Sequence, residues 1–107
     1  MEAIEPTALK AWLDDAARAK PVVLDVRENW EVALCRLPGT AHIPMPLVPS
    51  RAGELDRDAE TVVYCHHGGR SAQVGFFLER MGFTKVYNLT GGINAWSREV
   101  DPGVATY

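Results

Sequence analysis

Apolar residues repeat with a helical period in two stretches of the chain. The first stretch places apolar side chains at positions i, i+3, i+4 and i+7: Leu9, Trp12, Leu13 and Ala16. With a proline at the first turn, this pattern predicts a helix from about Pro6 to Arg18. The second stretch has the same spacing: Val74, Phe77, Leu78 and Met81. Because Gly82 follows as a typical C-terminal cap, we expect a helix from about Ser71 to Met81.

Short apolar runs separate the helical stretches and predict buried strands. Residues 22–24, 61–64 and 86–88 are rich in β-branched or aromatic side chains, and uninterrupted runs of this kind are typical of parallel strands covered on both faces. Ile4 and residues 41–43 indicate two further short strands. Strands that alternate with helices predict a small three-layer α/β domain, with a mainly parallel central sheet and helices on both faces.

The remaining segments give weaker signals. Trp30, Glu31 and Leu34 are spaced for a short helix, and residues 93–98 predict a last helix whose Trp96 belongs to the core. Three closely spaced prolines, at positions 44, 46 and 49, favour an extended segment. We expect a short connecting helix after them, at about residues 50–55, with Ser50 as its N-cap.

Length and composition narrow the class of protein. The 107 residues predict one domain over 1–107, and 47% hydrophobic with 23% charged residues is ordinary for a globular fold. A formal net charge of −3 gives no general attraction for nucleic acid or an anionic membrane. No apolar run approaches the roughly 20 residues of a membrane span, and the acidic first residues are unlike a signal peptide. With only two cysteines, the sequence favours a cytoplasmic protein without a disulfide framework.

The segment that carries candidate chemistry lies between the strand 61–64 and the helix after it: Cys65, His66, His67, Gly68, Gly69, Arg70 and Ser71. Gly68 and Gly69 are free to take positive φ, so backbone N–H groups can turn inward beside a helix N-terminus and cradle an anion. Such surroundings lower a cysteine pKa from about 8.5 to roughly 3.5–7.5. We therefore predict that Cys65 is a nucleophilic thiolate, although a cysteine after an apolar strand is also often a small buried hydrophobe.

A metal site is the main alternative use of these side chains. Cys65, His66, His67 and His42 carry ligand atoms, but no Cys-x2-Cys or His-x3-His pair is present. Adjacent ligands such as His66 and His67 usually point apart in an extended turn. We expect no metal and no other cofactor, and we expect the two loop histidines to be solvated residues at the pocket rim rather than general bases.

Three motifs resemble the rhodanese family of sulfurtransferases, and together they cover most of the chain. The active-site loop pattern is Cys65-x-x-Gly68-x-Arg70. An N-terminal pattern precedes it: Asp25-Val26-Arg27-Glu28, then Glu31, then Pro38-Gly39-x-x-His42-Ile43-Pro44. Residues 86–96 form a C-terminal pattern. The resemblance implies the same α/β architecture.

In this family the cysteine carries a persulfide, so the resemblance implies that Cys65 is catalytic and that His66, His67, Gly68, Gly69, Arg70 and Ser71 bind substrate. Asp25 and Arg27 would brace the loops as an ion pair. The chain departs from the family pattern at Cys35 and Arg36, where glycine and histidine are usual. Arg36 would add a positive charge near the site. Cys35 is expected to be a bystander, the alternative being a resolving thiol that pairs with Cys65 under oxidation.

The expected activity is transfer of a sulfane sulfur from a donor such as thiosulfate to cyanide or a thiol through a Cys65 persulfide. A sulfur-relay protein is a further candidate partner. Two other functions stay open: a persulfide-carrying relay or partner-binding module, and a Cys-dependent phosphatase or arsenate reductase. The phosphatase loop is disfavoured because its arginine lies six positions after the cysteine, whereas Arg70 lies five positions after Cys65.

Overall fold

Five strands form one parallel sheet in the computed structural model, which describes residues 1–107. The spatial order is β1-β5-β4-β2-β3, so β4 lies at the centre. The strands are β1 (Glu2–Ile4), β2 (Val22–Asp25), β3 (Ala41–His42), β4 (Thr61–Tyr64) and β5 (Val86–Leu89). The position of each strand matches the sequence prediction.

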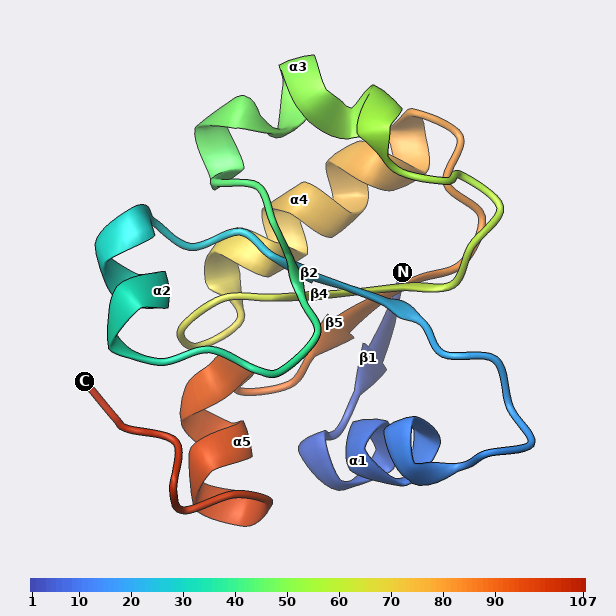
Figure 1. Cartoon of the computed structure of the whole chain (residues 1–107). Coiled ribbons are helices and arrows are strands. Elements are labelled where there is room, and N and C mark those ends of the chain that lie inside the picture. Colours follow the sequence, from blue (N-terminus) through green and yellow to red (C-terminus); the bar gives the residue numbers. More distant parts are fainter.

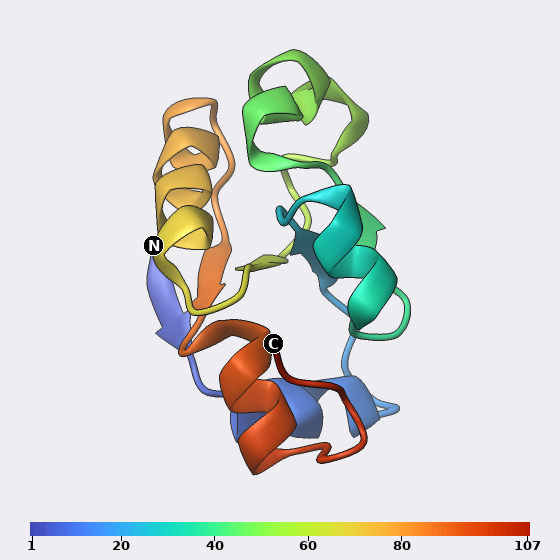
Figure 2. The same cartoon turned by 90° about the vertical axis from the view of Figure 1, so that its left-hand side faces the viewer.

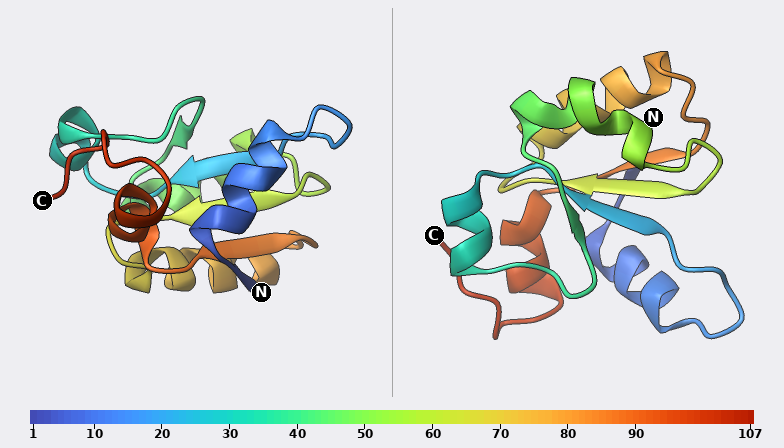
Figure 3. Two further views of the ribbon diagram at one scale, coloured as in Figure 1. Left: turned by 90° about the horizontal axis from the view of Figure 1, so that it is seen from below. Right: turned by 45° about the horizontal axis from the view of Figure 1, so that its top comes forward.

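Helices cover both faces of this sheet (Figures 1 and 3). On one face lie α1 (Pro6–Asp14) and α5 (Gly92–Glu99). The other face is covered by α4 (Gly69–Arg80) and by the short elements η1 (Met45–Leu47), α3 (Val48–Arg51) and η2 (Ala52–Glu54). Helix α2 (Asn29–Leu34) lies beyond the carboxyl ends of the strands. The predicted three-layer α/β fold is confirmed.

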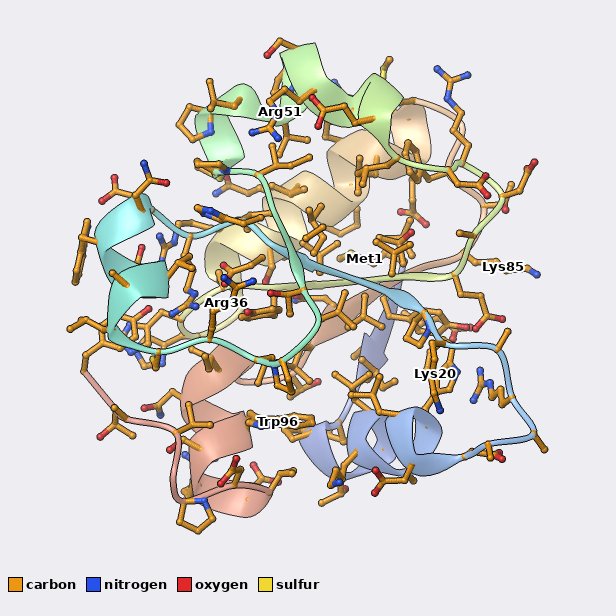
Figure 4. All side chains as sticks on the ribbon, viewed as in Figure 1. Met1, Lys20, Arg36, Arg51, Lys85 and Trp96 are labelled. Atoms are coloured by element: carbon orange, nitrogen blue, oxygen red, sulfur yellow. The ribbon has the colours of Figure 1, made fainter.

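The side chains of the central strands alternate between two apolar cores. Val23, Val62 and Tyr64 face α1 and α5, where they pack with Leu9, Trp12 and Trp96. Leu24 and Val63 face the opposite core, which includes Val74 and Leu78 of α4. Figure 4 shows Trp96 pointing from α5 toward α1, and its buried position confirms the prediction that it is a core residue.

The predicted end of the first helix is wrong. Helix α1 ends at Asp14 rather than near Arg18, because Asp15 is extended and its carboxylate accepts the N–H of Ala17 in a local turn. Lys20 Nζ donates to the carbonyl oxygen of Leu13 at 2.6 Å and so satisfies the end of the helix.

The proline-rich segment is helical where it was expected to be extended. Pro46 and Pro49 occupy first-turn positions of η1 and α3, where a missing N–H costs nothing. Ser50 lies inside α3 rather than at its N-cap, and its hydroxyl donates to the carbonyl oxygen of Leu47. No helix of the chain is both long and apolar enough to cross a bilayer.

Candidate functional site

Cys65 lies immediately after the central strand β4, at the carboxyl edge of the sheet. Strand β4 is flanked by β2 and β5, whose ends place Asp25 and Asn88 at the same edge. Only 1% of the Cys65 surface is exposed. The sulfur is therefore almost completely covered by the loop that leads into α4.

Backbone and hydroxyl donors converge on the sulfur of Cys65. The N–H groups of Gly68 and Ser71 lie 3.1 and 3.4 Å from Sγ, and the Ser71 hydroxyl lies 3.3 Å away. Gly68 makes this possible with φ of +117°, a conformation that glycine adopts without strain. Gly69, expected to share that role, does not have positive φ and is the first residue of α4.

These donors act on the ionisation of the thiol. Burial by itself raises the pKa of Cys65, but hydrogen bonds from Ser71, Gly68 and the His67 backbone outweigh it. The pKa of the thiol therefore lies below its ordinary value. The lowering comes from neutral donors and the start of a helix, as in other anion-binding loops.

Asn88 braces the loop from the neighbouring strand. Its amide donates to the carbonyl oxygen of Gly68 at 3.2 Å, and its carbonyl oxygen accepts the Ser71 hydroxyl at 2.6 Å. A hydroxyl has one proton, so the shorter bond to Asn88 makes the two backbone N–H groups the more constant donors to Cys65. Asn88 was not among the site residues predicted from the sequence, although its predicted place at the end of a strand put it at the correct edge.

The N-terminus of α5 forms hydrogen bonds to the loop that carries Cys65. The N–H groups of Ile93 and Asn94 donate to the carbonyl oxygens of Cys65 and His66, at 2.9 and 3.1 Å. Gly92 has φ of +62°, and a Cβ on it would collide with both of those carbonyl oxygens. The close approach of α5 to the loop therefore requires glycine at this position.

Arg70 forms a two-pronged ion pair with Glu31 of α2. Its Nη1 and Nη2 atoms lie 2.6 and 2.8 Å from the two carboxylate oxygens. The Arg70 bonds, which outweigh the effect of burial, lower the pKa of Glu31 to about 2. Two of the five guanidinium N–H groups are used, so three remain for other partners. A third of the Arg70 side chain is exposed, whereas Glu31 is almost fully buried.

Asp25 and Arg27 form a second ion pair, which is completely buried rather than at the surface. Arg27 Nε and Nη2 donate to the Asp25 carboxylate, with the shortest contact at 2.7 Å. The Tyr64 hydroxyl donates to the same carboxylate at 2.6 Å. The pair links the end of β2 to the segment before α2 and braces this edge of the sheet.

Tyr107 contacts residues of the site, which nothing in the sequence indicated. Its hydroxyl donates to Glu31 Oε2 at 2.5 Å and accepts a hydrogen bond from Arg27 Nη1 at 3.1 Å. Its ring stacks on His66 with centroids 3.9 Å apart and meets Trp30 edge-on. Figure 2 shows the C-terminal tail running between α2 and α5 to this position. The seven residues after Val100 contain no motif.

The two loop histidines differ in exposure. His67 is exposed, as expected for the pocket rim, but His66 is half-buried between His67 and Tyr107. Burial, together with the neighbouring His67, lowers the pKa of His66. His66 is therefore a packed residue rather than the solvated one predicted.

Three other residues considered in the sequence have contacts outside the loop. Arg36 is exposed and donates to Thr40, on the connection between α2 and β3 (Figure 4). Cys35 is a half-buried free thiol 3.8 Å from Arg27 Nη1. His42 Nε2 lies 2.7 Å from the carbonyl oxygen of Arg27, so it carries the proton and donates. No cluster of three or more His, Cys, Asp or Glu side chains is arranged to hold a metal ion.

Comparison with known proteins finds a matching family and several relatives. A family model for the rhodanese-like domain matches residues 5–99. The rhodanese-like/PpiC domain-containing protein 12 of Arabidopsis thaliana chloroplasts is 42% identical over 79% of this chain, which spans only 30% of that protein. A sulfurtransferase of Allochromatium vinosum is 39% identical over 78% of each chain. The thiosulfate sulfurtransferase GlpE of Pseudomonas entomophila is 34% identical over 77% of this chain and 74% of its own.

Solved structures agree with the sequence relatives. The crystal structure of a rhodanese-like domain protein from Staphylococcus aureus has a TM-score of 0.83 to this chain at 31% identity. The alignment covers 100% of this chain and 99% of that one. The architecture is therefore shared over the whole described length.

Proposed function

This chain belongs to the rhodanese-like domain family of sulfurtransferases, and we propose that it moves a sulfane sulfur from a donor such as thiosulfate to a thiophilic acceptor through a persulfide on Cys65. The observation that carries the proposal is the set of donors around one buried sulfur. Backbone N–H groups of Gly68 and Ser71 point at Sγ, and the thiol pKa is lowered.

In the first half-reaction the Cys65 thiolate attacks the outer sulfur of thiosulfate. A bond forms between Sγ and that sulfur, the sulfur–sulfur bond of thiosulfate breaks, and sulfite leaves with the bonding electron pair. The negative charge moves to the terminal sulfur of the new persulfide. The same loop N–H groups that hold the thiolate are placed to stabilise this charge.

In the second half-reaction an acceptor takes the terminal sulfur. Cyanide attacks it and leaves as thiocyanate, or a thiolate attacks it and leaves as a persulfide, and in both cases the electron pair returns to Cys65 Sγ. No metal or redox cofactor is needed for this balance. Small sulfur donors, cyanide or thiol acceptors and a sulfur-relay protein are the partners that fit the chemistry.

Arg70 is the proposed contact for an anionic donor. Its fork toward Glu31 fixes the plane of the guanidinium and leaves three N–H groups for the sulfonate oxygens of thiosulfate. The other residues proposed to bind substrate are His66, His67, Gly68, Gly69 and Ser71, the last through its backbone N–H. Asp25 and Arg27 support them as a buried ion pair.

Steady-state kinetics test the proposal. Two half-reactions through a covalent intermediate give ping-pong kinetics, with parallel double-reciprocal lines for thiosulfate and cyanide. We expect Cys65→Ser to form no thiocyanate and the matched control Cys35→Ser to equal the wild type. Intersecting lines, or activity retained in Cys65→Ser, would contradict the persulfide route.

A further inference from the structure

Tyr107 forms hydrogen bonds to a charged group of each ion pair of the site. Its hydroxyl lies between Arg27 Nη1, from which it accepts, and Glu31 Oε2, to which it donates. Arg27 is bound in turn by Asp25, and Glu31 by Arg70. The phenol therefore joins a fully buried pair to the pair at the mouth of the site.

The tail that carries Tyr107 is held in place by its own contacts. The N–H groups of Val100 and Asp101 donate to the carbonyl oxygen of Trp96, and the Ser97 hydroxyl donates to the carbonyl oxygen of Val104 at 2.5 Å. Val104 and Tyr107 pack against the apolar core beneath α5. The position of the phenol is therefore set by α5, the same helix whose N-terminus supports the Cys65 loop.

Each oxygen of the Glu31 carboxylate accepts two hydrogen bonds. Oε1 accepts from Arg70 Nη1 and from the N–H of Glu28, and Oε2 accepts from Arg70 Nη2 and from Tyr107. The Glu28 N–H holds one oxygen and the phenol holds the other. With both oxygens fixed independently of Arg70, the plane of the carboxylate determines the plane of the guanidinium.

We propose that Tyr107 is a positioning residue of the sulfur-transfer site: its hydroxyl holds Glu31, and through Glu31 it orients Arg70 toward the donor. Its ring is stacked on His66, a residue of the same loop as Cys65. The inference rests on the proposed function, because the donor is the ligand that Arg70 is oriented to meet. Tyr107 touches neither the sulfur nor the substrate, so its effect belongs to donor binding rather than to bond breaking.

The test compares two Tyr→Phe variants by their KM and kcat for thiosulfate. Tyr107→Phe keeps the ring and removes the hydroxyl. The control, Tyr87→Phe, removes a hydroxyl from β5, where the ring packs on Trp12 away from the loop. For Tyr107→Phe we expect KM to rise about fivefold with kcat within about twofold of the wild type, because the lost hydrogen bond to a charged group acts indirectly. Tyr87→Phe is expected to match the wild type.

A double-mutant cycle decides whether the effect passes through Glu31. In a Glu31→Gln background, adding Tyr107→Phe is expected to change KM no further. An unchanged KM for Tyr107→Phe in the wild-type background would overturn the proposal. A rise of the full size on top of Glu31→Gln, or an equal rise in Tyr87→Phe, would also overturn it.

NMR of the arginine side chains keeps this test separate from the proposed function. The Nε–H signal of Arg70, assigned by its loss in Arg70→Lys, is expected to shift and exchange faster with water in Tyr107→Phe but not in Tyr87→Phe. If thiosulfate is not a substrate, the kinetics fail for all variants while this signal still reports on Tyr107. An Arg70 signal identical in wild type and Tyr107→Phe would overturn the positioning role by itself.

Discussion

The hydrogen-bond donors around Cys65 Sγ are neutral dipoles, and they stabilise negative charge on the sulfur. Two backbone N–H groups and a hydroxyl surround the sulfur, while the cation of the loop, Arg70, is bound to Glu31. Neutral donors stabilise a thiolate and a persulfide anion alike, since both carry one negative charge. A site of this kind keeps its electrostatics through both half-reactions.

Glu31 links this chemistry to stability. Its pKa of about 2 in the folded chain lies below the value of about 4.3 expected when it is unfolded. A carboxylate whose pKa is lowered on folding stabilises the fold above the unfolded pKa, and this contribution is lost as pH falls from about 4.3 toward about 2. The contribution is therefore fully present at neutral pH.

We expect Glu31→Gln to lower the free energy of unfolding by about 3 kcal/mol at pH 7, which corresponds to the size of this pKa shift. Urea unfolding from pH 7 to pH 2 is the measurement, and the difference from wild type should shrink below about pH 4.3. Glu54→Gln is the control, because Glu54 pairs with Arg51 at the exposed surface and should matter little. A Glu31→Gln difference that stays constant down to pH 2 would show that the charge is not its cause.

At the level of elements, three pieces meet at Cys65. Strand β4 ends at the residue before the cysteine. Helix α4 begins directly after Gly68, and the N–H of Ser71 in its first turn points at the sulfur. The N-terminus of α5 donates to the loop carbonyl oxygens. At Gly92, α5 comes so close to the loop that an added Cβ would collide with the loop carbonyl oxygens.

Gly92→Ala tests this contact. The new Cβ would meet the carbonyl oxygens of Cys65 and His66, and the positive φ adds a cost of about 1–2 kcal/mol. Because a displacement of about 1 Å at a reacting atom can cost on the order of a hundredfold, we expect sulfur transfer to fall by that order. Thermal unfolding and thiosulfate turnover are measured together, with Gly53→Ala as control because its Cβ would meet nothing within 4 Å. Wild-type turnover in Gly92→Ala would show that α5 does not set the loop.

Elements with a strong local signal could be predicted from the sequence. The run 61–64, the glycines after Cys65 and the stripe on α4 locate the strand, the turn and the helix because each signal lies within a few residues. The segment around Pro46 and Pro49 could not be read in this way, since proline is compatible with both an extended chain and the first turn of a helix. The local turn at Asp15 likewise ends α1 before its apolar pattern does.

Across the whole molecule, one series of hydrogen bonds runs from the core to the mouth of the site. Tyr64 binds Asp25, Asp25 binds Arg27, and Arg27 reaches Tyr107. Tyr107 then binds Glu31, whose carboxylate binds Arg70. Residues separated by 39 positions, such as Glu31 and Arg70, meet in this series, and Tyr107 joins it from a tail without a motif. Pairings of this kind come from the fold, so local sequence patterns could not supply them.

The short loop from Cys65 to Arg70 leads us to expect sulfur transfer rather than phosphate hydrolysis. A tetrahedral phosphate has more oxygens to bind than the five-position ring from Cys65 to Arg70 can seat on its N–H groups. We expect aryl phosphate hydrolysis by the wild type to be negligible beside thiosulfate turnover, as measured by release of the chromogenic phenol. Hydrolysis at a comparable rate that disappears in Cys65→Ser would favour the phosphatase alternative.

The central claim is that sulfur is carried on Cys65, and intact-protein mass spectrometry tests it most directly. Wild-type protein is incubated with thiosulfate, freed of excess reagent and weighed beside Cys65→Ser and Cys35→Ser. The account predicts one added sulfur on the wild type and on Cys35→Ser, none on Cys65→Ser, and loss of that sulfur when cyanide is added. Equal sulfur on the wild type and on Cys65→Ser would contradict it.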